Sequence, residues 1–226
     1  MGVQSVSLAR LSLETNLIRE QPIFWRVIQA VERIAASVLL IIALPGLLVT
    51  ALVIIILSGR SPVIAHRRVG YRGRDIWVLK LRTMWPCNPE PLRGSRFVER
   101  IETDSIPHIK SRIDPRVTSR FAIFCRKYSI DELPQLWQVV TGEMALVGPR
   151  PVTATEIEAH YGSSAGQLLS VKPGITGLWQ VKGRSRLRRL QRKRLDLFMI
   201  RRWSAALYLL ILLATLPRVL TGKDAW

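Results

Sequence analysis

An uncharged apolar segment, VLLIIALPGLLVTALVIIIL at residues 38–57, restricts the folds open to this chain more than any other feature. As a helix, these twenty residues are long enough to cross a hydrocarbon layer of about 30 Å. Pro45 and Gly46 lie well inside the segment. A proline within a helix removes one backbone hydrogen bond and bends the axis. The segment therefore predicts a membrane helix with a break at Leu44 and Pro45.

The charges on both sides of this segment bear on how the helix meets the membrane. Arg26 and Arg33 precede it, and Arg60 follows it together with further arginines. Because arginine favours the cytoplasmic side, both ends of the helix are drawn to the same side. A re-entrant helix, break and helix over residues 26–60 satisfies this bias, provided that protein covers the freed carbonyl groups. A kinked spanning helix and a buried core helix remain alternatives.

The net charge of the chain calls for an anionic partner. Lys and Arg number 34 against 16 Asp and Glu, which gives a net charge of +18. Nucleic acid, an anionic membrane surface and a phosphorylated substrate all satisfy such a charge. Cys87 and Cys125 have no CxxC partner and the three histidines are scattered, so we expect no disulfide framework and no zinc site. Residues 1–30 lack a secretory signal pattern, and residues 1–25 are expected to form an amphipathic lead-in.

The rest of the chain predicts an α+β fold that is predominantly helical. Short β-prone stretches on both sides of a glycine-containing turn predict a small β-hairpin, and the proline-rich stretch at residues 85–115 predicts a long loop. Interfacial amphipathic helices are predicted at about residues 185–220, where a basic stretch is followed by a second apolar stretch. The apolar stretch is too short to span a membrane comfortably. A buried helix of the domain is the alternative for it. The hairpin is expected at about residues 63–68 and 75–82, and helices at about 118–127, 131–141, 153–161 and 164–170.

An acid pair, Asp131 and Glu132, stands out within the motif SIDELPQLW of this basic chain. Ser129 lies three residues before Glu132 and ahead of an apolar run, which is the spacing of a helix capping box. The residues alone leave capping and catalysis both open. The two roles are compatible, because a helix N-terminus offers backbone N–H groups and partial positive charge to a phosphate.

Six phrases then occur in the order of a known family. They are SPVIAHRRVGYRGR, LKLRTM, DPRVTSRF, RKYSIDELPQLWQVVTGEMALVGPRPV, KPGITGLWQVKGR, and RLDLF followed by WS. In this order the chain resembles the bacterial sugar transferases that act on polyprenyl phosphate, also called monotopic phosphoglycosyl transferases, in their minimal catalytic form. The resemblance runs from about residue 61 to the end, with a compatible apolar segment before it.

The resemblance implies a catalytic domain at residues 61–226 on the cytoplasmic face of the bacterial inner membrane. It implies transfer of a sugar-1-phosphate from a UDP-sugar to a polyprenyl phosphate such as undecaprenyl phosphate, with release of UMP, as the first membrane step of glycoconjugate or exopolysaccharide assembly. Asp131 maps to the nucleophile, which forms a covalent aspartyl-phosphosugar intermediate, and Glu132 maps to its partner, which holds Mg²⁺. Carboxylates are known nucleophiles in phosphoryl transfer.

The implied reaction brings an anionic nucleophile and two anionic substrates together, so cationic groups must neutralise their charge. Each basic residue alone also fits a solvated surface charge. Asp114 and Asp196 match family aspartates, for which pairing with an arginine is an equal alternative. By family position, the candidates for phosphate binding are Arg126, Lys80, Arg82, Arg150, Gln180 and Arg184.

Some positions depart from the family pattern. Leu44 stands where a serine commonly precedes the helix-breaking proline, Gln138 stands where asparagine is frequent, and the segment before Asp196 is unusually basic. A rival hypothesis is a membrane-attached basic protein without catalysis, either a scaffold or a nucleic-acid-binding protein that tracks phosphates with residues 182–194. That rival leaves SIDELPQLW unexplained and no nucleic-acid fold signature is seen, so we expect no nucleic-acid partner. The expected partners are the UDP-sugar, the polyprenyl phosphate and anionic phospholipid, and a homodimer remains open.

Overall fold

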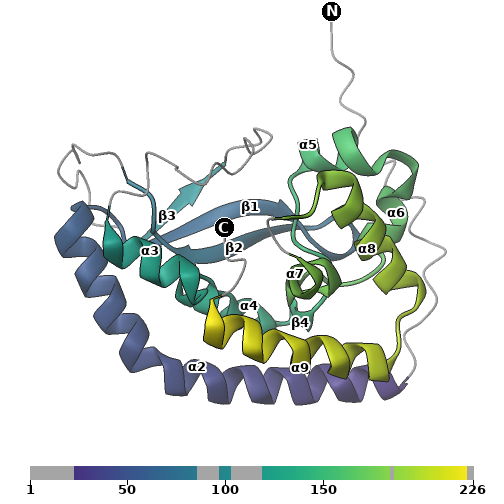
Figure 1. Cartoon of the computed structure of the whole chain (residues 1–226), viewed down its shortest axis with the longest axis horizontal. Helices are drawn as coiled ribbons and strands as arrows, with labels where there is room; N and C mark the ends of the chain where they lie inside the picture. Colours follow the sequence, from purple (N-terminus) through teal and green to yellow (C-terminus); the bar gives the residue numbers. More distant parts are fainter. Residues whose placement is uncertain (1–22, 86–96, 103–118, 184–185, 223–226) are drawn as a thin grey trace, which may run out of the picture.

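The computed structural model describes residues 23–85, 97–102, 119–183 and 186–222. The first of the described elements is a long helix, α2 (Ile23–Ser58). Figure 1 shows α2 along the lower edge of the molecule, curving upward in its second half. In the described part, one helix, Trp25–Ser58, is long and apolar enough to cross a membrane by length and composition. Its inward face packs on the sheet and the shorter helices above it, and the fold is α+β and mostly helical, as predicted.

The helix α2 continues through Pro45, so the break expected at Leu44 and Pro45 is a bend without unwinding. One turn later, the Thr50 hydroxyl donates to the carbonyl oxygen of Gly46 at 2.7 Å. Such a bond from a side chain to the preceding turn is common in bent helices. A continuous bent helix is compatible with the backbone because proline removes a single hydrogen bond of the ladder. The re-entrant topology stays a prediction.

The helices α2 and α9 (Ala205–Thr221) form one apolar layer, in which α9 lies beside the N-terminal half of α2 (Figure 1). The inward residues of α2, such as Ala36 and Ile54, are fully buried. The outward residues of both helices are aliphatic and exposed, and a continuous apolar surface of this kind marks a membrane or protein contact. They include Ile34, Ile41, Ile42, Val49, Leu52 and Ile56 of α2 and Leu209, Leu213, Leu216 and Leu220 of α9.

The predicted hairpin is confirmed as β1 (Val63–Val69) and β2 (Asp75–Leu81), which pair antiparallel around a short 3₁₀ turn, η2 (Tyr71–Gly73). A third strand, β3 (Val98–Ile101), pairs parallel to β1 on its other edge. The expectation of a loop throughout residues 85–115 is therefore wrong at β3. Its four residues carry no alternating apolar pattern, and the strand is defined by its pairing with β1.

The remaining elements follow the predicted order with shorter pieces. The helix expected at 131–141 begins as a 3₁₀ turn and continues as an α-helix after Pro134, and the helix expected at 153–161 changes to a π-turn part-way. The elements are α3 (Arg120–Lys127), η3 (Ile130–Gln135), α4 (Leu136–Thr141), β4 (Ala145–Val147), α5 (Ala154–Glu156), η4 (Ile157–Tyr161), η5 (Gly162–Ser164), α6 (Ala165–Leu169), β5 (Gly174–Thr176), α7 (Leu178–Lys182) and α8 (Arg189–Arg201). The strands β4 and β5 pair parallel in a separate two-stranded sheet.

The two helices expected at the membrane interface have different surroundings. The helix α9 lies beside α2 in the apolar layer, as expected of an interfacial helix. The helix α8 packs on α6, α7 and η4, and Figure 1 shows it descending from the side of α5 to the start of α9. The basic N-terminal half of α8 therefore lies away from the α2 and α9 layer.

Candidate active site

The acid pair lies on η3, between α3 and α4. Ser129 has left-handed backbone angles, φ 57° and ψ 24°, and its side chain makes no capping hydrogen bond. The capping-box interpretation is therefore wrong. The left-handed residue reverses the chain after α3, and the backbone N–H of Glu132 donates to the Ser129 carbonyl oxygen at 3.1 Å. The carboxylate of Glu132 is left for another contact.

That contact is with Lys80, whose Nζ donates to Glu132 Oε1 at 2.7 Å. Lys80 lies on β2, and the packing of β2 against η3 brings the two residues together across 52 positions of sequence. The side chains keep 25% and 30% of their surface exposed, so solvent and substrate can reach both. The structure thus pairs the predicted metal-binding carboxylate with a predicted phosphate-binding cation.

Arg82 has a different environment from Lys80. It is buried, its Nε donates to the carbonyl oxygen of Ser61 at 2.7 Å, and its guanidinium forms an ion pair with Glu99 of β3. Burial lowers the pKa of Arg82, and the charge of Glu99 works in the opposite direction. The predicted phosphate-binding role of Arg82 therefore competes with a contact that joins β2 to β3.

The pKa of His66 is affected by several of the predicted phosphate-binding cations. Burial, and after it the charges of Arg68, Lys80, Arg150 and Arg82, lower the pKa of His66 to about 4. The imidazole is therefore neutral at pH 7, and three predicted phosphate-binding residues act on this single position. His66 and Lys80 lie on the same face of the hairpin, because Ile64 is opposite Lys80 and side chains alternate along a strand. We call Arg68, Lys80, Arg82 and Arg150, the four cations whose charges act on His66, the cationic cluster.

Asp131 lies next to the buried side of α3. Burial, and then the charge of Asp131, raises the pKa of the Cys125 thiol to about 11, so this cysteine is an inert thiol beside the acid pair. Arg126 follows Cys125 in the last turn of α3, and its carbonyl oxygen accepts from the backbone N–H of Ser129 at 3.2 Å. Asp131 itself is half-buried. The turn between α3 and η3 thus places the predicted nucleophile and the first predicted phosphate-binding arginine near each other.

The remaining predicted site residues are spread over the domain. Arg150 lies in the loop after β4, where Val152 is bound to Val69 at the end of β1 by a 2.9 Å backbone hydrogen bond. Gln180 of α7 donates to the carbonyl oxygen of Ile175 at 3.0 Å, so its side-chain nitrogen joins α7 to β5. Three residues named in the sequence analysis lie outside the described part of the chain. They are Cys87, Asp114 and Arg184.

The acid pair fits one mode of Mg²⁺ binding. Among the described residues, no group of three His, Cys, Asp or Glu side chains lies together to hold a metal ion unaided. Mg²⁺ commonly takes one or two protein carboxylates and completes its shell with substrate phosphates and water. Glu132, partly exposed beside Lys80, fits that donor set.

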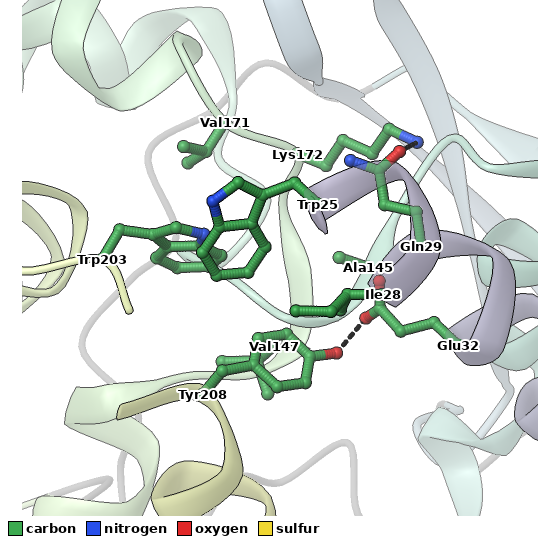
Figure 2. A pocket seen from close by; sticks show the side chains of 10 residues that line it. All are labelled: Trp25, Ile28, Gln29, Glu32, Ala145, Val147, Val171, Lys172, Trp203 and Tyr208. Atoms are coloured by element: carbon green, nitrogen blue, oxygen red, sulfur yellow. Dashed lines mark hydrogen bonds between the residues drawn. The ribbon is translucent and has the colours of Figure 1, made fainter. Parts of the chain in front are cut away.

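A separate pocket lies between the N-terminal part of α2, β4 and the start of α9 (Figure 2). The rings of Trp25 and Trp203 are 5.6 Å apart, and the Tyr208 hydroxyl donates to the buried carboxylate of Glu32. The backbone N–H of Leu146 donates to the same carboxylate at 2.7 Å. The pocket contains neither the acid pair nor a member of the cationic cluster. The residues of this pocket pack α2, α9 and β4 together, and they include the amphipathic aromatic residues that are typical of a membrane boundary.

Comparison with known proteins identifies the family of the chain. Residues 24–222 match the model of the family described as bacterial sugar transferase. The chain belongs to that family. This bacterial sugar transferase is 40% identical to the UDP-galactose-lipid carrier transferase of Erwinia amylovora over 190 residues, which cover 80% of the chain and 38% of the relative. Membership confirms the resemblance of the six sequence phrases and makes the chain a transferase enzyme.

Two further relatives differ in how much of their length this sugar transferase covers. The exopolysaccharide production protein ExoY of Rhizobium meliloti is 36% identical over 217 residues, which are 94% of the chain and 93% of the relative. The undecaprenyl-phosphate galactose phosphotransferase of Salmonella typhimurium is 32% identical over 219 residues, which are 96% of the chain and 44% of the relative. The chain thus spans less than half of the Erwinia and Salmonella relatives and nearly all of ExoY.

Proposed function

We propose that this sugar transferase moves a sugar-1-phosphate from a UDP-sugar to undecaprenyl phosphate and releases UMP. The observation that supports this most is the placement of Asp131 and Glu132 on η3, with Glu132 bound to Lys80 beside the cationic cluster. Phosphoryl transfer needs an accessible nucleophile and positive charge around the phosphate oxygens, and the half-buried Asp131 and the nearby cations support this assignment. Relatives named as undecaprenyl-phosphate galactose and glucose phosphotransferases support the acceptor and the sugar class.

In the first proposed step, a carboxylate oxygen of Asp131 attacks the phosphorus atom that carries the sugar. The bond from that phosphorus to the bridging oxygen of the diphosphate breaks, and UMP leaves with the electron pair. The product on the enzyme is an acyl phosphate that bears the sugar. Lys80, Arg150 and Arg126 neutralise the oxygens on which negative charge gathers.

In the second proposed step, an oxygen of undecaprenyl phosphate attacks the same phosphorus. The bond to Asp131 breaks, the carboxylate is restored, and the sugar leaves as undecaprenyl-diphosphate sugar. Mg²⁺, when bound through Glu132, would neutralise diphosphate oxygens during both displacements. The role of Glu132 would be to hold that ion, and its ion pair with Lys80 holds the carboxylate on the side of η3 that faces β2.

The proposed location is the cytoplasmic face of the bacterial inner membrane, with the exposed apolar layer of α2 and α9 in the lipid. The re-entrant topology predicts that residue 20 and the exposed position 74, at the end of the hairpin turn after α2, face the same side. Single cysteines at these positions, in a chain whose native cysteines are replaced, should react alike with an impermeant maleimide added to sealed vesicles. Labelling of one position only would show that α2 spans the bilayer.

A panel of UDP-sugars tests the proposed reaction. The purified chain is incubated with undecaprenyl phosphate, Mg²⁺ and one UDP-sugar at a time, and UMP is measured. We expect UMP release with at least one sugar and its loss when the lipid or Mg²⁺ is omitted under multiple-turnover conditions. If wild-type protein releases no UMP from any donor in the panel, the proposed function is wrong.

A further inference from the structure

The side-chain amide of Gln138, on α4, is buried and joins two segments of the candidate active site. Gln138 is 2% exposed, and its Nε2 donates to the backbone carbonyl oxygen of Trp77 on β2 at 2.7 Å. A carbonyl oxygen can only accept, so this bond determines which end of the amide faces β2. The other end, Oε1, is buried and has no hydrogen-bond partner among the described residues. Leaving that oxygen unpaired costs folding free energy, so Gln138 is poorly suited to simple filling of the core.

The ion pair of the candidate site joins the same two segments. Lys80 lies three residues after Trp77 on β2, and Glu132 lies six residues before Gln138 on the continuous run of η3 and α4. Three residues of strand extend about 10 Å, and six residues of 3₁₀ and α-helix rise by about 10 Å as well. The hydrogen bond and the ion pair, each 2.7 Å long, therefore tie the two segments together at matching distances along both. A shift of α4 along β2 would break both contacts.

Apolar packing between the two segments defines their register less sharply. Leu136 and Val139 of α4 pack with Ile76 and Val78 of β2 in one buried core cluster. Such contacts are non-directional, so a small slide of one segment keeps most of their buried area. A hydrogen bond is made only within a narrow range of lengths and angles. The bond of Gln138 to β2 thus adds the directional contact that the apolar residues lack.

The backbone of Gln138 is anchored as well. Its carbonyl oxygen accepts from the backbone N–H of Met144, just before β4, at 3.0 Å. The ion pair of Lys80 with Glu132, in contrast, keeps 25% and 30% of its side chains exposed. Ion pairs that solvent reaches contribute little to holding two elements in register. The buried hydrogen bond of Gln138 is therefore the contact that positions the ion pair, and the reverse does not hold.

We propose that Gln138 is a positioning residue: its amide, bonded to the Trp77 carbonyl oxygen, sets the register of η3 and α4 against β2 and so holds Glu132 at Lys80. The inference rests on the proposed function, in which Glu132 holds Mg²⁺ and Lys80 neutralises phosphate oxygens. Gln138 is buried, so it acts on the reaction only through the backbone segments that carry these two charged residues.

The reactivity of the Lys80 amine tests the inference without an activity assay. The purified chain is treated briefly with an amine-selective reagent, and the modified fraction of Lys80 is measured by peptide mass spectrometry. Gln138→Met keeps an unbranched side chain of similar length and removes the donor. Lys80 should then react about three-fold faster than in wild type, because an amine released from a carboxylate loses its proton more readily. Wild-type reactivity of Lys80 in Gln138→Met would overturn the inference.

Two controls separate a change of register from general loosening of the domain. Lys127, exposed at the end of α3, should react equally in wild type and in Gln138→Met. Thr141→Val removes a hydroxyl that bonds to the Gln138 carbonyl oxygen within α4, and it should leave Lys80 as reactive as in wild type. An equal rise at Lys127, or the same rise of Lys80 in Thr141→Val, would also overturn the inference.

A second variant covers the case in which Gln138→Met does not fold. Gln138→Asn keeps an amide but is one methylene shorter, so it cannot reach the Trp77 carbonyl oxygen in the present register. Lys80 should again react faster than in wild type, with Lys127 unchanged. Wild-type reactivity of Lys80 in this variant would contradict the inference in the same way.

A double-mutant cycle measures the effect on the reaction, through kcat/KM for UMP release and the Mg²⁺ concentration at half-maximal rate. The variants are Gln138→Met, Lys80→Met and the two together. We expect Gln138→Met to lower kcat/KM by about ten-fold and to require more Mg²⁺, and to change kcat/KM by less than about two-fold when Lys80 is already methionine. Equal losses in both backgrounds would show that Gln138 does not act through the ion pair. Absence of UMP release in wild-type protein concerns the proposed function alone, because the reactivity of Lys80 tests Gln138 in either case.

Discussion

Two acidic sites in this basic chain have opposite environments. Glu132, the neighbour of Asp131 on η3, keeps 30% of its side chain exposed and binds Lys80. Asp196 on α8 is 1% exposed and binds the uncharged hydroxyl of Tyr161. The first environment lets a substrate or ion reach the carboxylate, and the second keeps both away. An acid that reacts must be accessible, so the environment of Glu132 and Asp131 suits chemistry and that of Asp196 does not.

The largest expected effect is that of Asp131→Asn, which keeps the shape of the side chain and removes its nucleophilic oxygen. We expect UMP release to fall by about a thousand-fold or more, the scale seen when a covalent nucleophile is lost. The measurement is initial rate at saturating UDP-sugar and lipid. Activity within ten-fold of wild type would show that Asp131 is not the nucleophile. Neither acidic site would then react with the substrate.

A smaller loss is expected for Glu132→Gln. The amide is a weaker ligand for Mg²⁺ and no longer pairs with Lys80, so we expect turnover to fall by about a hundred-fold and half-saturation to require more Mg²⁺. The measurement is the rate of UMP release as a function of Mg²⁺ concentration. Glu143→Gln, at an exposed acid after α4, is the matched control. An unchanged Mg²⁺ curve in Glu132→Gln would contradict the role of Glu132 as the metal ligand.

The buried environment of Asp196 can be tested through the pH dependence of the free energy of unfolding. Its folded pKa of about 7 lies above the unfolded value, so the native state binds more protons between about pH 4 and 7. This carboxyl therefore makes the free energy of unfolding decline as pH rises through that window, on the order of 1 kcal/mol per pH unit. Asp196→Asn should lack this component in denaturant titrations of the detergent-solubilised protein. Parallel stability curves for the two proteins would show that Asp196 titrates normally.

The smallest effect is expected at the exposed pair of Arg67 and Asp75, whose atoms are 2.6 Å apart with side chains 40% and 42% exposed. Solvent screening makes such pairs worth about 0 to 1 kcal/mol. Asp75→Asn should therefore shift the unfolding midpoint only slightly. A large shift would mean that exposure does not distinguish the acids of this chain.

Local patterns predicted part of this fold correctly. The hairpin and α3 were predicted because alternation, turns and helix signals lie within short windows of sequence. The strands β3, β4 and β5 were not, because each is only three or four residues long and is defined by pairing with a distant segment. The capping box at Ser129 had the right spacing, but a left-handed backbone cannot be read from spacing.

The candidate site shows the same division. The acid pair and the candidate phosphate-binding cations were predicted from the family resemblance of their motifs, and their roles stay predictions. The surroundings of His66 and Tyr161 were missed, because they arise from contacts between segments that are far apart in the sequence. The alternation of the strand around His66 indicated only that it shares a face with Lys80. No pattern in the sequence indicated the pairing of Tyr161 with Asp196, which are 35 residues apart.

The central claim is that Asp131 carries the sugar phosphate covalently, and the most direct measurement is the mass of the protein after incubation with a reactive UDP-sugar and Mg²⁺ in the absence of lipid. The account predicts a wild-type adduct with the mass of one sugar phosphate, located on the peptide that contains Asp131 and removed by undecaprenyl phosphate. Asp131→Asn should show none. UMP release that depends on added lipid, with no adduct on wild-type protein in rapid-quench samples, would contradict it.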